Sequence, residues 1–310
     1  MGATLVFSSP CDDFEHWRAL LTARLPGVQV CLPEQVRHPE QVLYALVWSP
    51  PSGFFGRYPN LRLVVNLGAG VDALVARDDL PAAPITRLAD PAMTRMMGSY
   101  VLFAVLRYAR GIPALEQAQR ERRWAYAHPP LPHTLRVGIL GLGELGSHAA
   151  LELVRQGFSV QGWARSPKQL DGVACSHGEA ALPGFLASTD ILVVMLPLTP
   201  QTHGLLDAER LAWLPEGACL INVARGQVLD QAALTAALAS RRLAHATLDV
   251  FSTEPLPPSD PLWAMGNVLI TPHVASMALP ATAVVHIAEN IARLQRGEPV
   301  LHQVDPTRGY

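Results

Sequence analysis

Near the middle of the chain lies the stretch Arg136-Val137-Gly138-Ile139-Leu140-Gly141-Leu142-Gly143-Glu144-Leu145-Gly146. Its apolar run at 137–140 is short enough for a buried strand, and helix-permissive residues follow from 144 to 156. The two are joined by closely spaced glycines, which favour a tight turn. The stretch therefore predicts a strand, a turn and a helix in direct succession, the unit from which α/β proteins are built.

The glycines match the pattern GxGxxG, in which each position has its own mechanical reason. Gly141 makes the turn, Gly143 lets the backbone approach a pyrophosphate, and Gly146 lets the helix pack closely on the strand. The helix begins at Glu144 and Leu145, where free N–H groups and the helix dipole attract phosphate. We expect these five residues to bind a dinucleotide.

A second predicted strand, 159–164, ends about 20 residues after the glycines, where dinucleotide sites read the ribose. NAD sites usually carry an acidic residue there, whereas this chain has Arg165, Ser166 and Lys168. Cations and a hydroxyl can hold a 2′-phosphate that a carboxylate would repel. The sequence therefore favours NADP over NAD, the alternative being that Arg165 and Lys168 are ordinary solvated loop charges.

The composition bounds the class of protein. The chain has 310 residues, 49% hydrophobic and 16% charged, which is enough for two domains with sizeable cores. Its formal net charge of −2 gives no general attraction to nucleic acid or to an anionic membrane, so we expect neither as a partner. The partner expected is a small-molecule substrate.

The cysteines and the first residues bear on location. The four cysteines are scattered and form no CxxC pair, so we expect no metal site, and their sparse use suits a reducing compartment. The N-terminus lacks the basic and apolar regions of a signal peptide, and no apolar run reaches the length of a membrane helix. We expect a cytoplasmic protein.

Residues 1–97 form a separate predicted α/β unit, with strands at 4–8, 28–32, 44–48, 61–67 and 85–88. Within it, the strand at 61–67 runs into another glycine turn that contains Ala69 and Gly70. Their N–H groups would suit a carboxylate, although a turn of this kind also occurs as a corner that binds nothing.

A long helix is predicted from about 93 to 122, and residues 100–106 within it are apolar on every side. Such a helix must be buried on every side, either against a second subunit or inside a monomer. Residues 98–276 then form a second unit, a doubly wound parallel sheet of several β–α repeats.

Polar residues follow three of the predicted strands of this second unit, namely Arg225, Glu254 and His273. Ligands of doubly wound sheets bind beyond the carboxyl ends of the strands, so these side chains are expected in one cleft. The guanidinium of Arg225 can hold a carboxylate and polarise a ketone, and His273 can donate a proton as hydride arrives at the carbon. Glu254 can orient the His273 ring. Any one of them alone is more often a structural or solvated group.

Six motifs in order closely resemble those of the D-isomer-specific 2-hydroxyacid dehydrogenases, and the resemblance covers nearly the whole chain. They are residues 66–72 (NLGAGVD), 141–146 (GLGELG), 196–199 (LPLT), 221–226 (INVARG), 248–251 with 254–256 (LDVF and EPL), and 271–273 (TPH). Finer features resemble the reductases of glyoxylate and hydroxypyruvate within this family, namely residues 45–51 (ALVWSPP), 163–166 (WARS) and the ending 303–310 (QVDPTRGY).

The resemblance implies an NADPH-dependent enzyme with Arg225, Glu254 and His273 as its catalytic set. It places Leu196 and Pro197 against the nicotinamide and Asp249 near its carboxamide. It also implies that the substrate lies near Trp48, with its carboxylate at Ala69, Gly70 and Arg225.

The resemblance further implies a Rossmann cofactor domain, 98–276, inserted in a discontinuous flavodoxin-like substrate domain, 1–97 and 277–310. The helix near 98–122 would build a homodimer. Two alternatives stay open at this point: a reductase of a larger 2-oxo acid, since pocket size cannot be read from the sequence, and a nucleotide-sensing module without catalysis.

Overall fold

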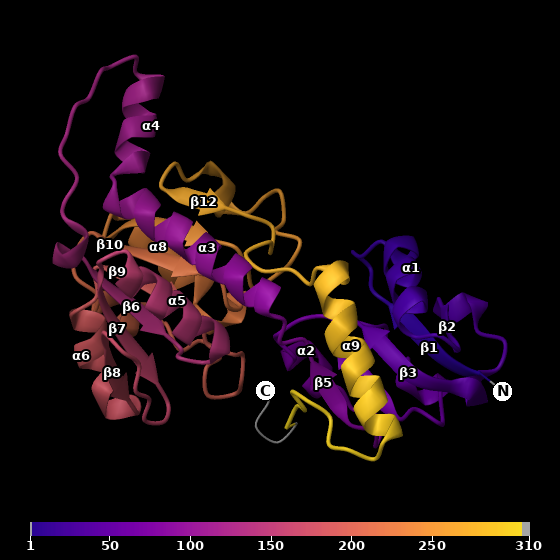
Figure 1. The fold of residues 1–310 in the computed structure, drawn as a ribbon. Helices are drawn as coiled ribbons and strands as arrows, with labels where there is room; N and C mark the ends of the chain where they lie inside the picture. The colour runs from indigo at the N-terminus through magenta and orange to yellow at the C-terminus, as the bar shows by residue number, and fades with distance from the viewer. Residues whose placement is uncertain (1, 306–310) are drawn as a thin grey trace. The chain divides into compact units, whose positions relative to one another are not determined.

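The computed structural model describes residues 2–305 (Figure 1). By its internal contacts the chain divides into two compact units, one containing Thr94–Ser276 and the other the residues up to Met93 and from Met277 onward. Residues 306–310, most of the C-terminal stretch on which the finer resemblance partly rests, lie outside the described residues.

The first unit contains, in its described residues, a sheet of five parallel strands in the order β2-β1-β3-β4-β5. This order is flavodoxin-like, as expected. Helices α1 and α9 pack together on one face and share a core with Leu5, Phe7 and Leu46 (Figure 1). The strands are β1 Ala3–Ser8, β2 Val28–Cys31, β3 Val42–Val47, β4 Leu63–Asn66 and β5 Ile85–Arg87, and the helices are α1 Phe14–Arg24, α2 Asp72–Val75 and α9 Pro280–Gln295.

The second unit contains, among the residues described, a sheet of seven parallel strands in the order β12-β11-β10-β9-β6-β7-β8. Numbered within the unit, the order places the first strand at the centre and winds outward in both directions, which is the Rossmann topology. The strands are β6 Arg136–Leu140, β7 Ser159–Ala164, β8 Val173–His177, β9 Ile191–Val194, β10 Ala218–Asn222, β11 Leu243–Leu248 and β12 Val268–Ile270.

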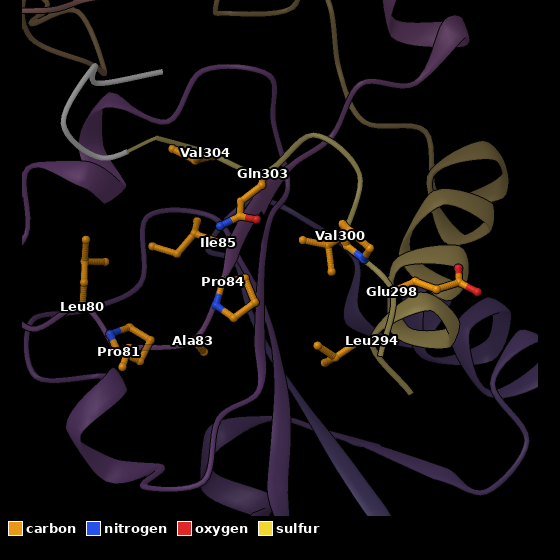
Figure 2. A pocket seen from close by; sticks show the side chains of 12 residues that line it. Leu80, Pro81, Ala83, Pro84, Ile85, Leu294, Glu298, Val300, Gln303 and Val304 are labelled. Atoms are coloured by element: carbon orange, nitrogen blue, oxygen red, sulfur yellow. The ribbon is translucent and has the colours of Figure 1, made fainter. Parts of the chain in front are cut away.

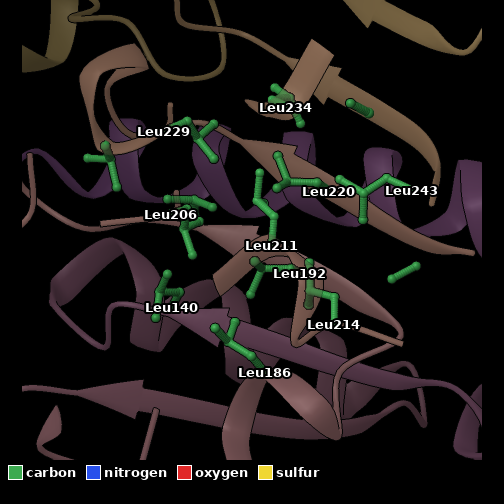
Figure 3. Close-up of a cluster of buried hydrophobic side chains, with 14 of the residues drawn as sticks. Leu140, Leu186, Leu192, Leu206, Leu211, Leu214, Leu220, Leu229, Leu234 and Leu243 are labelled. Atoms are coloured by element: carbon green, nitrogen blue, oxygen red, sulfur yellow. The ribbon is translucent and has the colours of Figure 1, made fainter. Parts of the chain in front are cut away.

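Both faces of this sheet are covered, which explains why its central strands β6, β9 and β10 are buried along most of their length. A leucine-rich cluster fills one face, where α6, α7 and α8 pack (Figure 3). The other face packs on α3 and α5 through residues such as Val101, Val105 and Leu153. The helices are α3 Pro91–Ala109, α4 Ile112–Arg120, α5 Glu144–Arg155, α6 Leu182–Ala187, α7 Ala208–Ala212 and α8 Gln231–Ala239.

The prediction of a single helix over 93–122 is wrong, because the structure has two helices there, α3 and α4. The break lies at Gly111, whose φ of 64° is left-handed. Pro113 lacks the N–H that a continuous helix would need at that position, so a new helix starts there instead. Helix α4 and the segment after it extend away from the sheet of their unit (Figure 1).

The edge strand β8 and the short helix α6 were not predicted. Strand β8 buries only its first residue, Val173, so it lacks the apolar run of the central strands. Its place is fixed by pairing with β7.

Candidate active site

The glycine turn after β6 has the geometry that its sequence predicts. Gly141 has a φ of +117°, and a Cβ there would lie 2.6 Å from the carbonyl oxygen of Met195. A Cβ on Gly146 would lie 1.9 Å from the carbonyl oxygen of Gly141, so the helix could not pack as it does. A Cβ on Gly143 would meet nothing within 4 Å. Two glycines therefore serve packing, and the third borders open space.

The start of α5 faces the same turn. Gly143 is the N-cap residue of α5 and supplies no side chain to cap it. Glu144 is exposed and Leu145 is partly buried against the core of this face. The uncapped N–H groups at this helix start could bind an anion.

The residues predicted to read the ribose directly follow β7, the neighbour of β6. Arg165, Ser166 and Lys168 are all exposed. Lys168 is also the only lysine in the whole sequence, so it is the only side chain with a primary amine that a reagent could modify.

On the other side of β6, strand β9 ends just before Leu196 and Pro197. Leu196 is 8% exposed and joins the leucine-rich core, whereas Pro197 is exposed. The turn after them is fixed by Thr202, whose hydroxyl donates to the carbonyl of Pro197 at 2.6 Å. Predicted cofactor residues thus follow three adjacent strands at one edge of the sheet.

His273 and Glu254 form a hydrogen-bonded pair, with 2.8 Å between His273 Nδ1 and Glu254 Oε2. The other carboxylate oxygen of Glu254 accepts from the amide of Phe251 at 2.8 Å. Burial raises the pKa of Glu254, but these hydrogen bonds and the charges of His273 and Arg225 outweigh it, so the net pKa lies below the ordinary value. Glu254 is thus a carboxylate at neutral pH and orients the imidazole through Nδ1.

Arg225 follows β10 and is placed beside this pair by close backbone packing. A Cβ on Gly226 would lie 1.8 Å from the carbonyl carbon of Phe251, so the two backbones touch. The side chain of Gln227 also donates to the carbonyl of Ser252 at 3.1 Å. The structure therefore brings together Arg225, Glu254 and His273, which lie far apart in the sequence.

Asp249 is 1% exposed, and its carboxylate accepts hydrogen bonds from the loop that carries His273. The donors are the hydroxyl of Thr271 at 2.6 Å and the amides of Val274 and Ala275, each at 2.9 Å. The predicted contact of Asp249 with a carboxamide stays a prediction. The structure adds a role in holding the 271–275 loop that the sequence alone did not suggest.

The remaining predicted residues lie in the first unit, at the carboxyl ends of β3 and β4. Trp48 packs on Gly68, where a Cβ would lie 2.5 Å from its ring. Asn66 Nδ2 donates to the carbonyls of Gly68 and Gly70 at 3.0 and 2.9 Å. These two bonds tie down the loop that contains Ala69 and Gly70, whose contact with a carboxylate stays a prediction. Asn66 was missed as a support of this loop, although it opens the NLGAGVD motif.

A cavity of about 480 Å³ also lies in the first unit, between the segments 80–85 and 294–304 (Figure 2). Its walls are mainly apolar, with Leu80, Pro84 and Val300 among them, and include none of the predicted site residues. Among residues 2–305 there is no group of three or more His, Cys, Asp or Glu side chains able to hold a metal ion. Nor does any helix in the described range have the length and apolar character to cross a membrane.

Comparisons with known proteins agree with this architecture. Residues 102–275 match the model of the D-isomer specific 2-hydroxyacid dehydrogenase, NAD binding domain. The chain is 41% identical to glyoxylate/hydroxypyruvate reductase A of Serratia proteamaculans, covering 99% of each. It is 61% identical, with a TM-score of 0.96 and full coverage of both chains, to a D-isomer specific 2-hydroxyacid dehydrogenase of Xanthobacter autotrophicus solved with NADPH and MES.

A second solved structure is the NADPH-dependent glyoxylate/hydroxypyruvate reductase of Sinorhizobium meliloti in complex with NADP and sulfate. It is 35% identical, covers 100% of both chains and has a TM-score of 0.94. The family model and these full-length relatives lead to one conclusion: the chain belongs to the D-isomer specific 2-hydroxyacid dehydrogenase family.

Proposed function

We propose that this protein is an NADPH-dependent reductase of small 2-oxo acids, converting glyoxylate to glycolate and hydroxypyruvate to D-glycerate. The observation that carries the proposal is the His273–Glu254 pair beside Arg225, on the same sheet as a glycine turn with open space at Gly143. Relatives with glyoxylate/hydroxypyruvate reductase names support the substrate class. The first unit would bind substrate and the second the cofactor.

The residues at the carboxyl edge of the second sheet fit NADPH. The pyrophosphate would lie at Gly143 and the start of α5, close to Glu144 and Leu145, where the positive end of the helix dipole favours an anion. Arg165, Ser166 and Lys168 would hold the 2′-phosphate. Leu196 and Pro197 would border the nicotinamide and Asp249 its carboxamide, and bound NADPH would supply the hydride.

In the proposed reaction, the guanidinium of Arg225 binds the substrate carboxylate and polarises the ketone oxygen. The amides of Ala69 and Gly70 hold the carboxylate as well, and Trp48 limits the size of the group beside it. His273, protonated, holds a proton at Nε2 and delivers it to the ketone oxygen as negative charge develops there. Glu254 stabilises the imidazolium and fixes the ring through Nδ1.

The direct test follows NADPH absorbance with glyoxylate and then hydroxypyruvate, using NADH as the comparison. NADPH-selective turnover of either acid is expected. Turnover only of bulkier 2-oxo acids such as phenylpyruvate would replace the substrate, and turnover with NADH alone would replace the cofactor. Tight NADPH binding with no turnover of any acid in the panel would refute the enzyme and favour a nucleotide-sensing module.

Two glycine substitutions should separate folding from cofactor binding. Gly146→Ala is expected to lower the free energy of unfolding by about 1–3 kcal/mol, because its Cβ overlaps backbone that cannot move away cheaply. Gly143→Ala should leave unfolding nearly unchanged yet weaken NADPH binding about tenfold or more, because its Cβ occupies the space proposed for the pyrophosphate. Urea unfolding and NADPH titration measure the two effects. Equal NADPH affinity in Gly143→Ala and wild type would contradict the placement.

The double variant R165A/K168A should raise the KM for NADPH by about 10²-fold and leave that for NADH unchanged, because each charged hydrogen bond contributes about 1.5–3 kcal/mol. The single lysine permits an independent check. An amine-reactive reagent should modify Lys168 in the free protein, and NADPH should protect it more than NADH does. Equal protection by the two cofactors would argue that Lys168 is a solvated loop charge.

We also propose a homodimer built through α3, α4 and the segment that follows. This region exposes large apolar side chains, with Trp124 96%, Tyr126 79% and Phe103 50% exposed, a concentration typical of an interface. The variant W124S/Y126S is expected to shift a dimer toward monomer in sedimentation velocity. W263S is the matched control, since Trp263 is 54% exposed elsewhere in this unit. A monomeric wild-type protein would refute the proposal.

A cytoplasmic location completes the proposal. The four cysteines, all among the described residues, are free thiols, which suits a reducing compartment. An NADPH-dependent reductase also needs a compartment that supplies NADPH, and the cytoplasm does so. Fractionation of cells with an antibody to the protein tests the location.

A further inference from the structure

Tyr100, on α3, reaches the loop that carries His273. Its hydroxyl lies 2.5 Å from the hydroxyl of Thr271, and the Thr271 hydroxyl donates to Asp249 at 2.6 Å. Helix α3 packs on one face of the sheet, and Thr271 directly follows β12, the strand that leads into this loop. The proposed catalytic set gives no role to these consecutive hydrogen bonds from Tyr100 through Thr271 to Asp249.

The direction of the hydrogen bonds follows from counting protons. The hydroxyl of Thr271 has one hydrogen and gives it to the Asp249 carboxylate, so Tyr100 must be the donor to Thr271. Burial raises the pKa of Tyr100, its bond with Thr271 lowers it, and the net pKa lies above the ordinary value. The tyrosine therefore keeps its proton at neutral pH and donates throughout the working range.

The loop that these hydrogen-bonded hydroxyls support has a strained backbone at His273. His273 has a φ of 57°, a left-handed conformation that costs a non-glycine residue energy unless its surroundings enforce it. The amide of His273 donates to the carbonyl of Asp249 at 2.8 Å, and the following amides of Val274 and Ala275 donate to the Asp249 carboxylate. Asp249 thus holds the backbone at His273 and at the two residues after it, and on the preceding side it holds the hydroxyl of Thr271.

We propose that Tyr100 is a positioning residue for His273, acting through Thr271 and Asp249 to hold the imidazole at its angle to Glu254. The proposal rests on the proposed function for its catalytic consequence. The physical reason for the proposal is that the buried Asp249 carboxylate can orient the loop firmly only if its own hydrogen-bond donors are held in place. Tyr100 holds one of these donors, the Thr271 hydroxyl. Loss of the tyrosine hydroxyl leaves Thr271 free to rotate and so loosens the grip of Asp249 on the loop.

The chain offers a matched control two turns along the same helix. Tyr108 makes an equivalent bond, 2.6 Å from its hydroxyl to that of Thr247, but on a strand residue away from the histidine loop. Y100F and Y108F therefore remove the same group from the same helix. Thr271→Val and Thr271→Ser complete the set, since the first removes the relay hydroxyl and the second keeps it.

We expect Y100F and Thr271→Val each to lower kcat by about five- to tenfold, which is the effect of losing one hydrogen bond that positions the loop. Thr271→Ser should restore most of the rate, Y108F should keep the wild-type kcat, and the double variant Y100F/T271V should be no slower than either single one. Hydrogen exchange at the amides of His273, Val274 and Ala275 should accelerate in Y100F and not in Y108F.

The two readouts separate this proposal from the proposed function. If the wild-type protein reduced no 2-oxo acid, the function would fall, while exchange of the loop amides would still decide whether Tyr100 positions the loop. Unchanged exchange in Y100F would overturn the proposal. So would equal losses in Y100F and Y108F, which would reduce the effect to the general stability of α3.

Discussion

His273→Ala is expected to lower kcat for glyoxylate by about 10²–10⁴-fold, the usual contribution of a positioned acid or base. The variant removes the group that carries the proton and leaves Arg225 in place to bind the substrate. The KM for the acid should therefore change much less than kcat. Steady-state rates with saturating NADPH give both constants.

The backbone at His273 calls for a second variant as a control for folding. Because its φ is 57°, alanine there adds strain, whereas asparagine is among the residues that tolerate this conformation. His273→Asn should keep the wild-type urea midpoint and NADPH affinity and still lose the rate. A variant of His273 with full activity would show that the proton comes from elsewhere.

Arg225→Lys is expected to lower kcat/KM for small 2-oxo acids by about 10²-fold or more, although the charge is kept. A guanidinium can bridge carboxylate and ketone with two fixed donors, while an ammonium offers a single centre, and each charged hydrogen bond lost costs about 1.5–3 kcal/mol. Substrate titration should show a raised KM as well as a lower kcat, in contrast to the histidine variants.

Arg225 follows β10, which β9 separates from β6 and its glycine turn, so NADPH affinity serves as the internal control. Arg242→Lys is a matched second control, since this arginine lies just before β11 and donates to the carbonyls of Ala212 and Leu214. It should cost some stability without a change in substrate KM. Equal kinetics of Arg225→Lys and wild type would remove Arg225 from the substrate site.

The sequence by itself determined the fold class, because patterns local in the chain carry that information. The strand at 136–140, the glycine spacing and the helix after it follow from steric and periodic rules that involve neighbours only. Alternation of strands and helices then restricted the topology to parallel sheets, and both sheets are parallel. The family motifs came with the same local segments, so candidate site residues could be named from them.

The tertiary structure alone decided how these residues meet. No rule of sequence brings the backbone of Gly226 against Phe251, or places the Asp249 carboxylate under the loop at 271–275. Strand order sets both, and strand order depends on which faces bury together over the whole unit. The helix break was not predicted because it depends on the left-handed backbone of the single residue Gly111. The edge strand β8 was not predicted because its place depends on pairing with β7. Tyr100 belongs to the same class, because its hydroxyl meets a partner 171 residues away that packing alone selects.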